Sequence, residues 1–163
     1  MDRTSFFLCR FRLGGTDAWL IWYSNGSDGI LVDADGRIPC FPDACDLLRF
    51  AESRSIPVET EEPALHDLDA VDVWVSNPSR GVIDCNQLLR AWNLFTDLSA
   101  SVDGSFDEDY GYTNATYEKL FQCAAASGTH EGWDADELLV LRDTLAAGLD
   151  LFRHHVHVQV IGI

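Results

Sequence analysis

Apolar and polar residues alternate along the first part of the chain. Phe7, Cys9 and Phe11 fall on one side of an extended segment. Arg10 and Arg12 fall on the other side, and this period of two predicts a half-buried β-strand. Turns that contain glycine separate further stretches of β-forming residues. We expect strands over residues 5–13, 18–23, 30–33 and 37–41, joined as an antiparallel β meander.

A first helical pattern follows this meander. The Pro-Asp pair at residues 42–43 can open a helix that ends near residue 53. A short extended segment is expected over residues 56–60, and the acidic stretch around Pro63 is expected to cross the surface. Residues 71–75 alternate in a way that fits either a strand or a helical turn.

The pattern becomes clearly helical at residue 84. Leu88, Trp92 and Phe95 recur at the spacing of one helix face. Asp84 precedes them at the position of an N-cap. A tryptophan and a phenylalanine on one stripe bury a large apolar area. Residues 84–102 are therefore predicted to form the central helix of the core.

Two more helices are expected in the C-terminal half, over residues 114–126 and 133–153. Asp134 and Glu137 have the spacing of a capping box, which marks the start of the second of these helices. Gly148 lies inside the same helix, where its missing side chain predicts a close approach by a neighbouring backbone.

The last ten residues alternate once more. Val156, Val158 and Val160 are separated by polar residues, which predicts a short final strand. Strands first and helices afterwards are typical of an α+β fold. We expect a single domain over residues 1–163, mainly β in 1–80, mainly helical in 81–153, and with a C-terminal strand in 154–163.

Net charge indicates more about the function of this chain than any sequence motif does. Twenty-seven acidic residues oppose eleven basic ones, which gives a formal net charge of -16. Such a chain repels nucleic acid and anionic membranes and attracts a basic protein partner. The alternative interpretation is that the acidity only keeps the protein soluble. The sequence has no apolar run of the roughly 20 residues that a membrane span needs.

The N-terminal apolar run is too short for a secretory signal, so we expect a cytoplasmic protein. The five cysteines, Cys9, Cys40, Cys45, Cys85 and Cys123, are then expected to be free structural thiols. Cys40 and Cys45 have no second pair beside them, and their spacing makes a poor zinc site.

Candidate chemistry is sparse, and we predict neither a catalytic residue nor a cofactor. The chain contains no glycine-rich nucleotide-binding motif, and its acidic loops do not match a calcium loop. His154, His155 and His157 form a cluster, in which His155 and His157 could contribute to a metal site on a strand. A metal-dependent protein or enzyme built on these histidines is thus an alternative, although a third or fourth ligand is not evident.

An acidic loop rich in aromatic residues is the predicted partner-binding site. Carboxylates can steer a basic partner while aromatic side chains anchor it. The segment from Glu59 to Asp72, with its six acidic residues, is a second and weaker candidate. The predicted partner-binding residues are Asp103, Phe106, Asp107, Glu108, Asp109, Tyr110 and Tyr112.

The chain resembles the immunity proteins of bacterial toxin systems. The resemblance is based on the N-terminal stretches WLIWY and ILVDADGRI, the helix CNQLLRAWNLFTDL and the acid-aromatic loop. Members of that group neutralise a cognate toxin by tight binding. The resemblance implies a protein partner, no cofactor and no turnover. We therefore expect a non-catalytic acidic binding protein that masks a basic partner, plausibly a toxin, and that binds neither nucleic acid nor a membrane.

Overall fold

The computed structural model describes residues 3–78, 83–102, 106, 113–126 and 132–158. Its strands are β1 (Ser5–Leu13), β2 (Thr16–Ser24), β3 (Asp28–Ile30), β4 (Cys40–Phe41), β5 (Val58–Glu59) and β6 (Leu65–Asp67). Its helices are α1 (Ala44–Ser53), α2 (Leu68–Ser76), α3 (Cys85–Ser101), α4 (Thr113–Ala126) and α5 (Ala135–His155).

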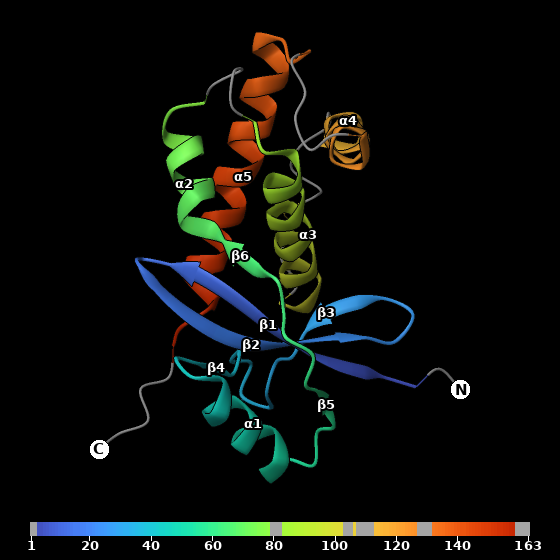
Figure 1. Ribbon diagram of the computed structural model, residues 1–163, viewed down its shortest axis with the longest axis vertical. Helices are drawn as coiled ribbons and strands as arrows, with labels where there is room; N and C mark the ends of the chain where they lie inside the picture. Colours follow the sequence, from blue (N-terminus) through green and yellow to red (C-terminus); the bar gives the residue numbers. More distant parts are fainter. Residues whose placement is uncertain (1–2, 79–82, 103–105, 107–112, 127–131, 159–163) are drawn as a thin grey trace.

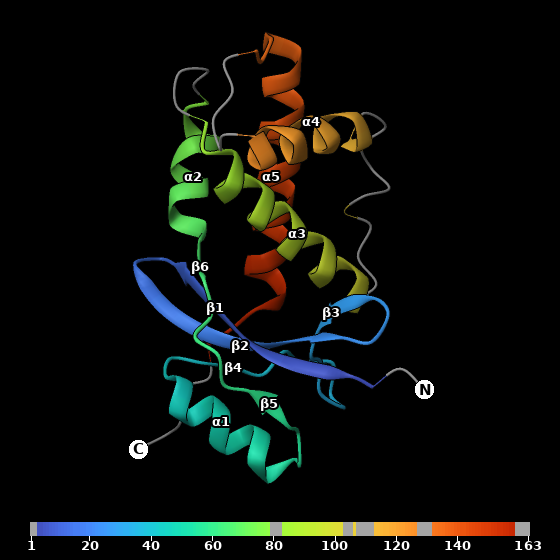
Figure 2. The ribbon, with the colours of Figure 1, turned by 45° about the vertical axis from the view of Figure 1, so that its right-hand side comes forward.

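One mixed sheet lies between two layers of helix (Figure 1). Helix α1 covers one face, while α2, α3 and α5 stand on the other face and α4 crosses beside α3 (Figure 2). Strands precede most of the helices along the chain, so the predicted α+β class is confirmed. The larger apolar cluster joins β1 and β2 to the helical layer, and a smaller one lies under α1.

Strand β1 has partners on both sides. It pairs with β2 in antiparallel register from Ser5↔Ser24 to Leu13↔Thr16, as the predicted hairpin requires. On its other side it pairs in parallel with β5 and then with β6. The sheet is therefore mixed, and the purely antiparallel meander that we expected accounts for only part of it.

The predicted third and fourth strands form differently from expectation. Strand β3 ends at Ile30, and the expected return strand shortens to β4, which pairs with β2. Between them the Asp33 side chain accepts hydrogen bonds from the amides of Asp35 and Arg37 at 2.9 Å. This side-chain cap holds a turn, with Gly36 at φ +77°, in place of a continuous hairpin ladder.

The ambiguous segment 71–75 belongs to helix α2. Asp67 caps it, because its carboxylate accepts a hydrogen bond from the Ala70 amide at 3.0 Å. Leu68 and Val71 are buried against the helical layer. Alternation in this short stretch therefore reflected one buried helix face rather than a strand.

Helices α3 and α5 form the centre of the helical layer. Asp84 caps α3, and Asp134 and Glu137 form the predicted capping box at the start of α5. Phe95 of α3 lies directly over Gly148, where an added Cβ atom would collide with the ring. The predicted central helix is confirmed, whereas the close approach expected from a neighbouring backbone at Gly148 is made by a side chain, the Phe95 ring.

The predicted C-terminal strand is wrong over the described residues. Helix α5 continues to His155, and residues 156–158 are not in a strand. The buried stripe that ends at Phe152 supports the extra turn, and Arg153 and the histidines suit the negative end of the helix dipole. Residues 159–163 lie outside the part of the chain that the structure describes.

The expectation that all cysteines are free is also wrong. Cys85 at the start of α3 and Cys123 in α4 form a disulfide, because the two helices bring their Cα atoms to 6.0 Å. Cys9, Cys40 and Cys45 are free thiols, as predicted. Within the described ranges, no helix is both long and apolar enough to cross a membrane.

Candidate functional site

Most of the predicted acid-aromatic site lies outside the described residues, namely Asp103, Asp107, Glu108, Asp109, Tyr110 and Tyr112. Phe106 is described, and it is only 5% exposed. Its ring packs edge-on against Phe95, and its amide donates a hydrogen bond to the Ser99 hydroxyl at 3.2 Å. Phe106 therefore packs in the core, and partner binding by the acid-aromatic loop stays a prediction.

The three C-terminal histidines lie near one another at the end of α5. The rings of His154 and His155 meet edge to face, and a ring nitrogen of His157 lies 3.0 Å from the His154 carbonyl oxygen. Burial and the two neighbouring histidines lower the pKa of His155. Among the described residues, no group of three or more His, Cys, Asp or Glu side chains could hold a metal ion.

Many cations of this chain are engaged by its own carboxylates. The side chains of Arg10 and Arg12 both bind Asp17, which lowers the pKa of that carboxyl group. Among the described residues, further ion pairs join Arg12 to Asp67, Lys119 to Glu137, Arg153 to Asp72, Arg142 to Asp143 and Arg49 to Asp46. Basic residues are scarce, so this pairing leaves exposed carboxylates without a cation.

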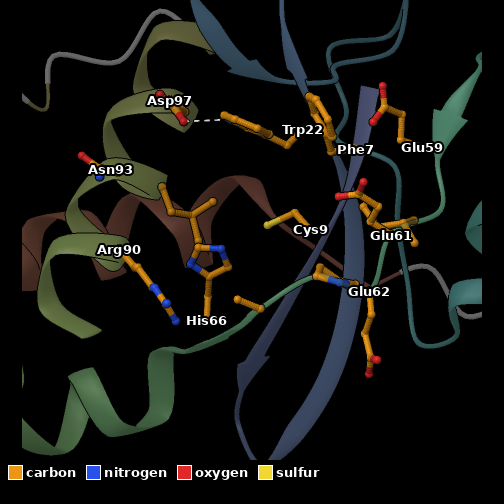
Figure 3. A pocket seen from close by; sticks show the side chains of 14 residues that line it. Phe7, Cys9, Trp22, Glu59, Glu61, Glu62, His66, Arg90, Asn93 and Asp97 are labelled. Atoms are coloured by element: carbon orange, nitrogen blue, oxygen red, sulfur yellow. Dashed lines mark hydrogen bonds between the residues drawn. The ribbon is translucent and has the colours of Figure 1, made fainter. Parts of the chain in front are cut away.

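A cleft of about 310 Å³ opens between the sheet, helix α3 and the segment that connects β5 to β6 (Figure 3). The parallel partner of β1 is interrupted there, between Glu59 and Leu65. Pro63 lies in the interruption and has no amide hydrogen to donate to a ladder. The connecting segment therefore leaves β1 near Cys9 and forms one wall of the cleft.

Two aromatic rings form the wall contributed by the sheet. Phe7 and Trp22 lie with ring centroids 5.2 Å apart, and the indole N–H of Trp22 donates a hydrogen bond to Asp97 of α3 at 2.9 Å. Partial burial raises the pKa of Asp97, an effect that this hydrogen bond opposes. Cys9 lies at the floor, and burial raises the pKa of its thiol to about 12, which makes it a poor nucleophile.

Two nitrogen-bearing side chains lie at the other end of the cleft. Arg90 of α3 is exposed, and His66 of β6 is half-buried beside it (Figure 3). The Nδ1 atom of His66 is buried and has no hydrogen-bond partner among the described residues. Burial and the Arg90 charge both lower the pKa of His66, so its imidazole is neutral near pH 7.

Carboxylates gather along the connecting segment, at Glu59, Glu61 and Glu62, and all three are exposed. They form no ion pair with any described residue of the chain. These residues belong to the acidic segment that the sequence marked as its weaker candidate. No sequence pattern predicted that Trp22, Arg90 and Asp97 would line the same cleft as these glutamates, because that proximity depends on long-range packing.

No family model matches this chain, and no curated protein matches it. Among solved structures, it is similar to the C-terminal domain of SatS, which was crystallised in complex with bromine. The TM-score is 0.66 at 14% sequence identity, and the match covers 95% of this chain and 94% of that one. At this identity the similarity concerns the fold, so the chain shares the α+β architecture of the SatS C-terminal domain.

Proposed function

We propose that this chain is a non-catalytic acidic binding protein that masks a basic protein partner, in the manner of an immunity protein that neutralises a toxin. The observation that carries this proposal is the distribution of charge. The chain's own ion pairs use most of its described cations, whereas Glu59, Glu61 and Glu62 remain exposed together without one. Clustered carboxylates of this kind favour fast encounter with a basic surface.

The proposed surface also includes Asp107, Glu108 and Asp109 of the acid-aromatic loop, which lie outside the described residues. Nucleic acid and anionic membranes are unfavourable partners for a chain with a net charge of -16. The buried Cys9 and Cys40 thiols have raised pKa values, which fits a protein that holds a partner rather than one that attacks a substrate through these groups.

The test is capture of a partner at low salt, followed by reconstitution. The tagged chain is used to capture proteins from source cells, and a stoichiometric basic protein is expected. The purified pair should associate more slowly as ionic strength rises, because the steering field is screened. If the partner is a toxin, adding the chain should abolish its activity.

Triple variants with the same change in net charge test which carboxylates form the partner surface. Neutralising Glu59, Glu61 and Glu62 as amides should weaken the complex, and so should neutralising Asp107, Glu108 and Asp109. Neutralising the exposed and separated Asp35, Glu52 and Asp150 changes the net charge equally and should have little effect. Equal affinity for all three variants would contradict a local partner surface, and an acidic or absent partner would contradict the function.

The same proposal places the protein in the cytoplasm. Cys85 and Cys123 test this location, because structural disulfides persist mainly in oxidising compartments. Alkylation of thiols in intact cells, followed by mass spectrometry, should find this pair reduced if the protein is cytoplasmic. A fully oxidised pair would instead indicate an oxidising compartment.

A further inference from the structure

The cleft beside α3 has two chemically different ends. Arg90 and His66 lie at one end, and Asp97 and Glu59 lie at the other (Figure 3). The rest of the lining is mainly apolar, and the Phe7–Trp22 pair lies between Asp97 and Glu59 (Figure 3). Apolar pockets with a few convergent polar groups are typical small-ligand sites, because the polar groups fix the orientation of the ligand.

The first end is suited to an anion. Arg90 forms no ion pair with the residues that the structure describes. The neighbouring Nδ1 atom of His66 is buried without a partner in the same part of the chain, and leaving such a group unsatisfied destabilises the fold. A carboxylate bound here would pair with the exposed Arg90 guanidinium, while the neutral His66 ring forms the wall beside it.

The second end is suited to a cation. Asp97 is half-buried and accepts a hydrogen bond from Trp22, but it has no cationic partner among the described residues. Burial of its charge is unfavourable, and a bound ammonium group would offset that cost. Glu59 is exposed beyond the Phe7 and Trp22 rings, and its charge adds to the negative field on this side of the cleft.

Helix α3 fixes the spacing between the two ends. Arg90, Asn93, Leu94 and Asp97 follow an i, i+3, i+4, i+7 pattern, so they share one helix face. Seven residues of helix separate Arg90 from Asp97 by about 10 Å along the axis. An extended chain spans at most about 3.3–3.6 Å per residue, so about three residues reach from one end to the other. A single amino acid is too short.

We propose that this cleft binds a short zwitterionic peptide of about three residues, with its carboxylate at Arg90, its ammonium at Asp97, and an apolar side chain against Phe7 and Trp22. A cleft of about 310 Å³ lies at the small end of ligand sites, which suits a tripeptide rather than a folded segment. The cleft shares Glu59, Glu61 and Glu62 with the acidic surface proposed for the basic partner, but peptide binding here requires neither a protein surface nor a net positive ligand.

Calorimetric titration of the purified chain with the tripeptide Ala-Leu-Ala tests the assignment directly. The peptide with free ends should bind, and either N-acetylation or C-terminal amidation should weaken binding by about tenfold, the usual scale of one charged hydrogen bond. No binding at millimolar peptide, or equal binding of the capped forms, would overturn the proposal. Equal binding of the acetylated form alone would show that the site takes a carboxyl terminus only.

Two variants then assign each end. Arg90→Gln should lower the affinity for the peptide with free ends. It should leave the affinity for the amidated peptide unchanged, since that form no longer carries the carboxylate. Asp97→Asn should lower the affinity for the peptide with free ends and leave the affinity for the acetylated peptide unchanged. Arg49→Gln, on α1 across the sheet, is the control and should bind like the wild type.

Circular dichroism and thermal melting establish that each variant is folded before titration. If both variants lower the affinity for every peptide equally, Arg90 and Asp97 do not bind the two peptide termini as proposed, and the assignment is wrong. Because the titration uses synthetic peptides and the isolated chain, its failure is distinguishable from a failure to capture a basic protein partner.

Discussion

Asp97 combines a structural and a binding role in one carboxylate. It holds the Trp22 indole through a hydrogen bond of 2.9 Å, and partial burial raises its pKa. A carboxyl group whose pKa is higher in the folded state binds more protons there than in the unfolded state. Its contribution to stability is therefore most favourable below the ordinary pKa of aspartate and is lost as pH rises through the raised pKa.

Asp97→Asn should consequently raise the melting temperature at about pH 7 and leave it nearly unchanged at about pH 3. The amide oxygen can still accept the hydrogen bond from Trp22, while the half-buried charge is removed. Thermal unfolding measured across this pH range checks the result. Asp150→Asn, at an exposed position of α5, provides the control and should show no such pH-dependent gain.

Gly148 shows how one missing side chain sets the distance between two helices. The ring of Phe95 occupies the space where a Cβ atom would stand. In an open helix, Gly→Ala stabilises by about 1 kcal/mol because alanine has the higher helix propensity. Gly148→Ala should instead destabilise the fold by about 1–3 kcal/mol through overpacking.

Urea unfolding measures this change through the transition midpoint. A second variant, Gly148→Ala with Phe95→Leu, should recover part of the loss because the smaller side chain leaves room for the methyl group. A stabilised single variant would contradict the close packing of α3 on α5.

The disulfide between α3 and α4 is the main covalent constraint at the level of elements. It closes a loop with a sequence separation of 38 residues. The chain-entropy model assigns a loop of this length about 4 kcal/mol of stabilisation. Cys85→Ser combined with Cys123→Ser should lower the free energy of unfolding by roughly this amount or somewhat less.

Thermal unfolding with and without a thiol reductant provides the matching measurement. The melting temperature of the wild type should fall toward that of the double variant when the disulfide is reduced. The melting temperature of the double variant should not change with reductant. A wild type that is insensitive to reductant would indicate that packing alone holds α4 in place.

Local signals predicted the elements well. The capping box of α5 and the apolar face of α3 involve residues close together in sequence, and both formed as expected. Pairing over long distances was not predictable in the same way. The parallel register of β6 on β1 and the partner of β4 depend on how the helical layer packs, which no short pattern encodes.

The candidate cleft was predicted only through its acidic segment. Glu59 and Glu61 belonged to a stretch already marked by its charge, whereas Trp22 and Asp97 lie 75 residues apart in the sequence and meet only after folding. Cys85 and Cys123 illustrate the same limit, because their pairing follows from the contact between α3 and α4.

At the scale of the whole molecule, net charge is the dominant property. A formal charge of -16 on 163 residues repels itself in the compact state. Raising NaCl from about 0.05 M to about 0.5 M should raise the melting temperature, since salt screens this repulsion. Differential scanning calorimetry measures the change. A melting temperature that falls with salt would indicate that the internal ion pairs contribute more than the repulsion costs.

The double pairing of β1 also has a consequence for how the chain acquires its structure during synthesis. The β1–β2 hairpin is local and can form as soon as residue 24 is available. The other side of β1 stays unpaired until the segment ending at Asp67 has been made, which takes seconds at usual translation rates. During that interval a long apolar strand presents an open ladder edge to neighbouring nascent chains. The speed at which the ribosome delivers residues 25–67 thus sets how long this protein is exposed to mispairing.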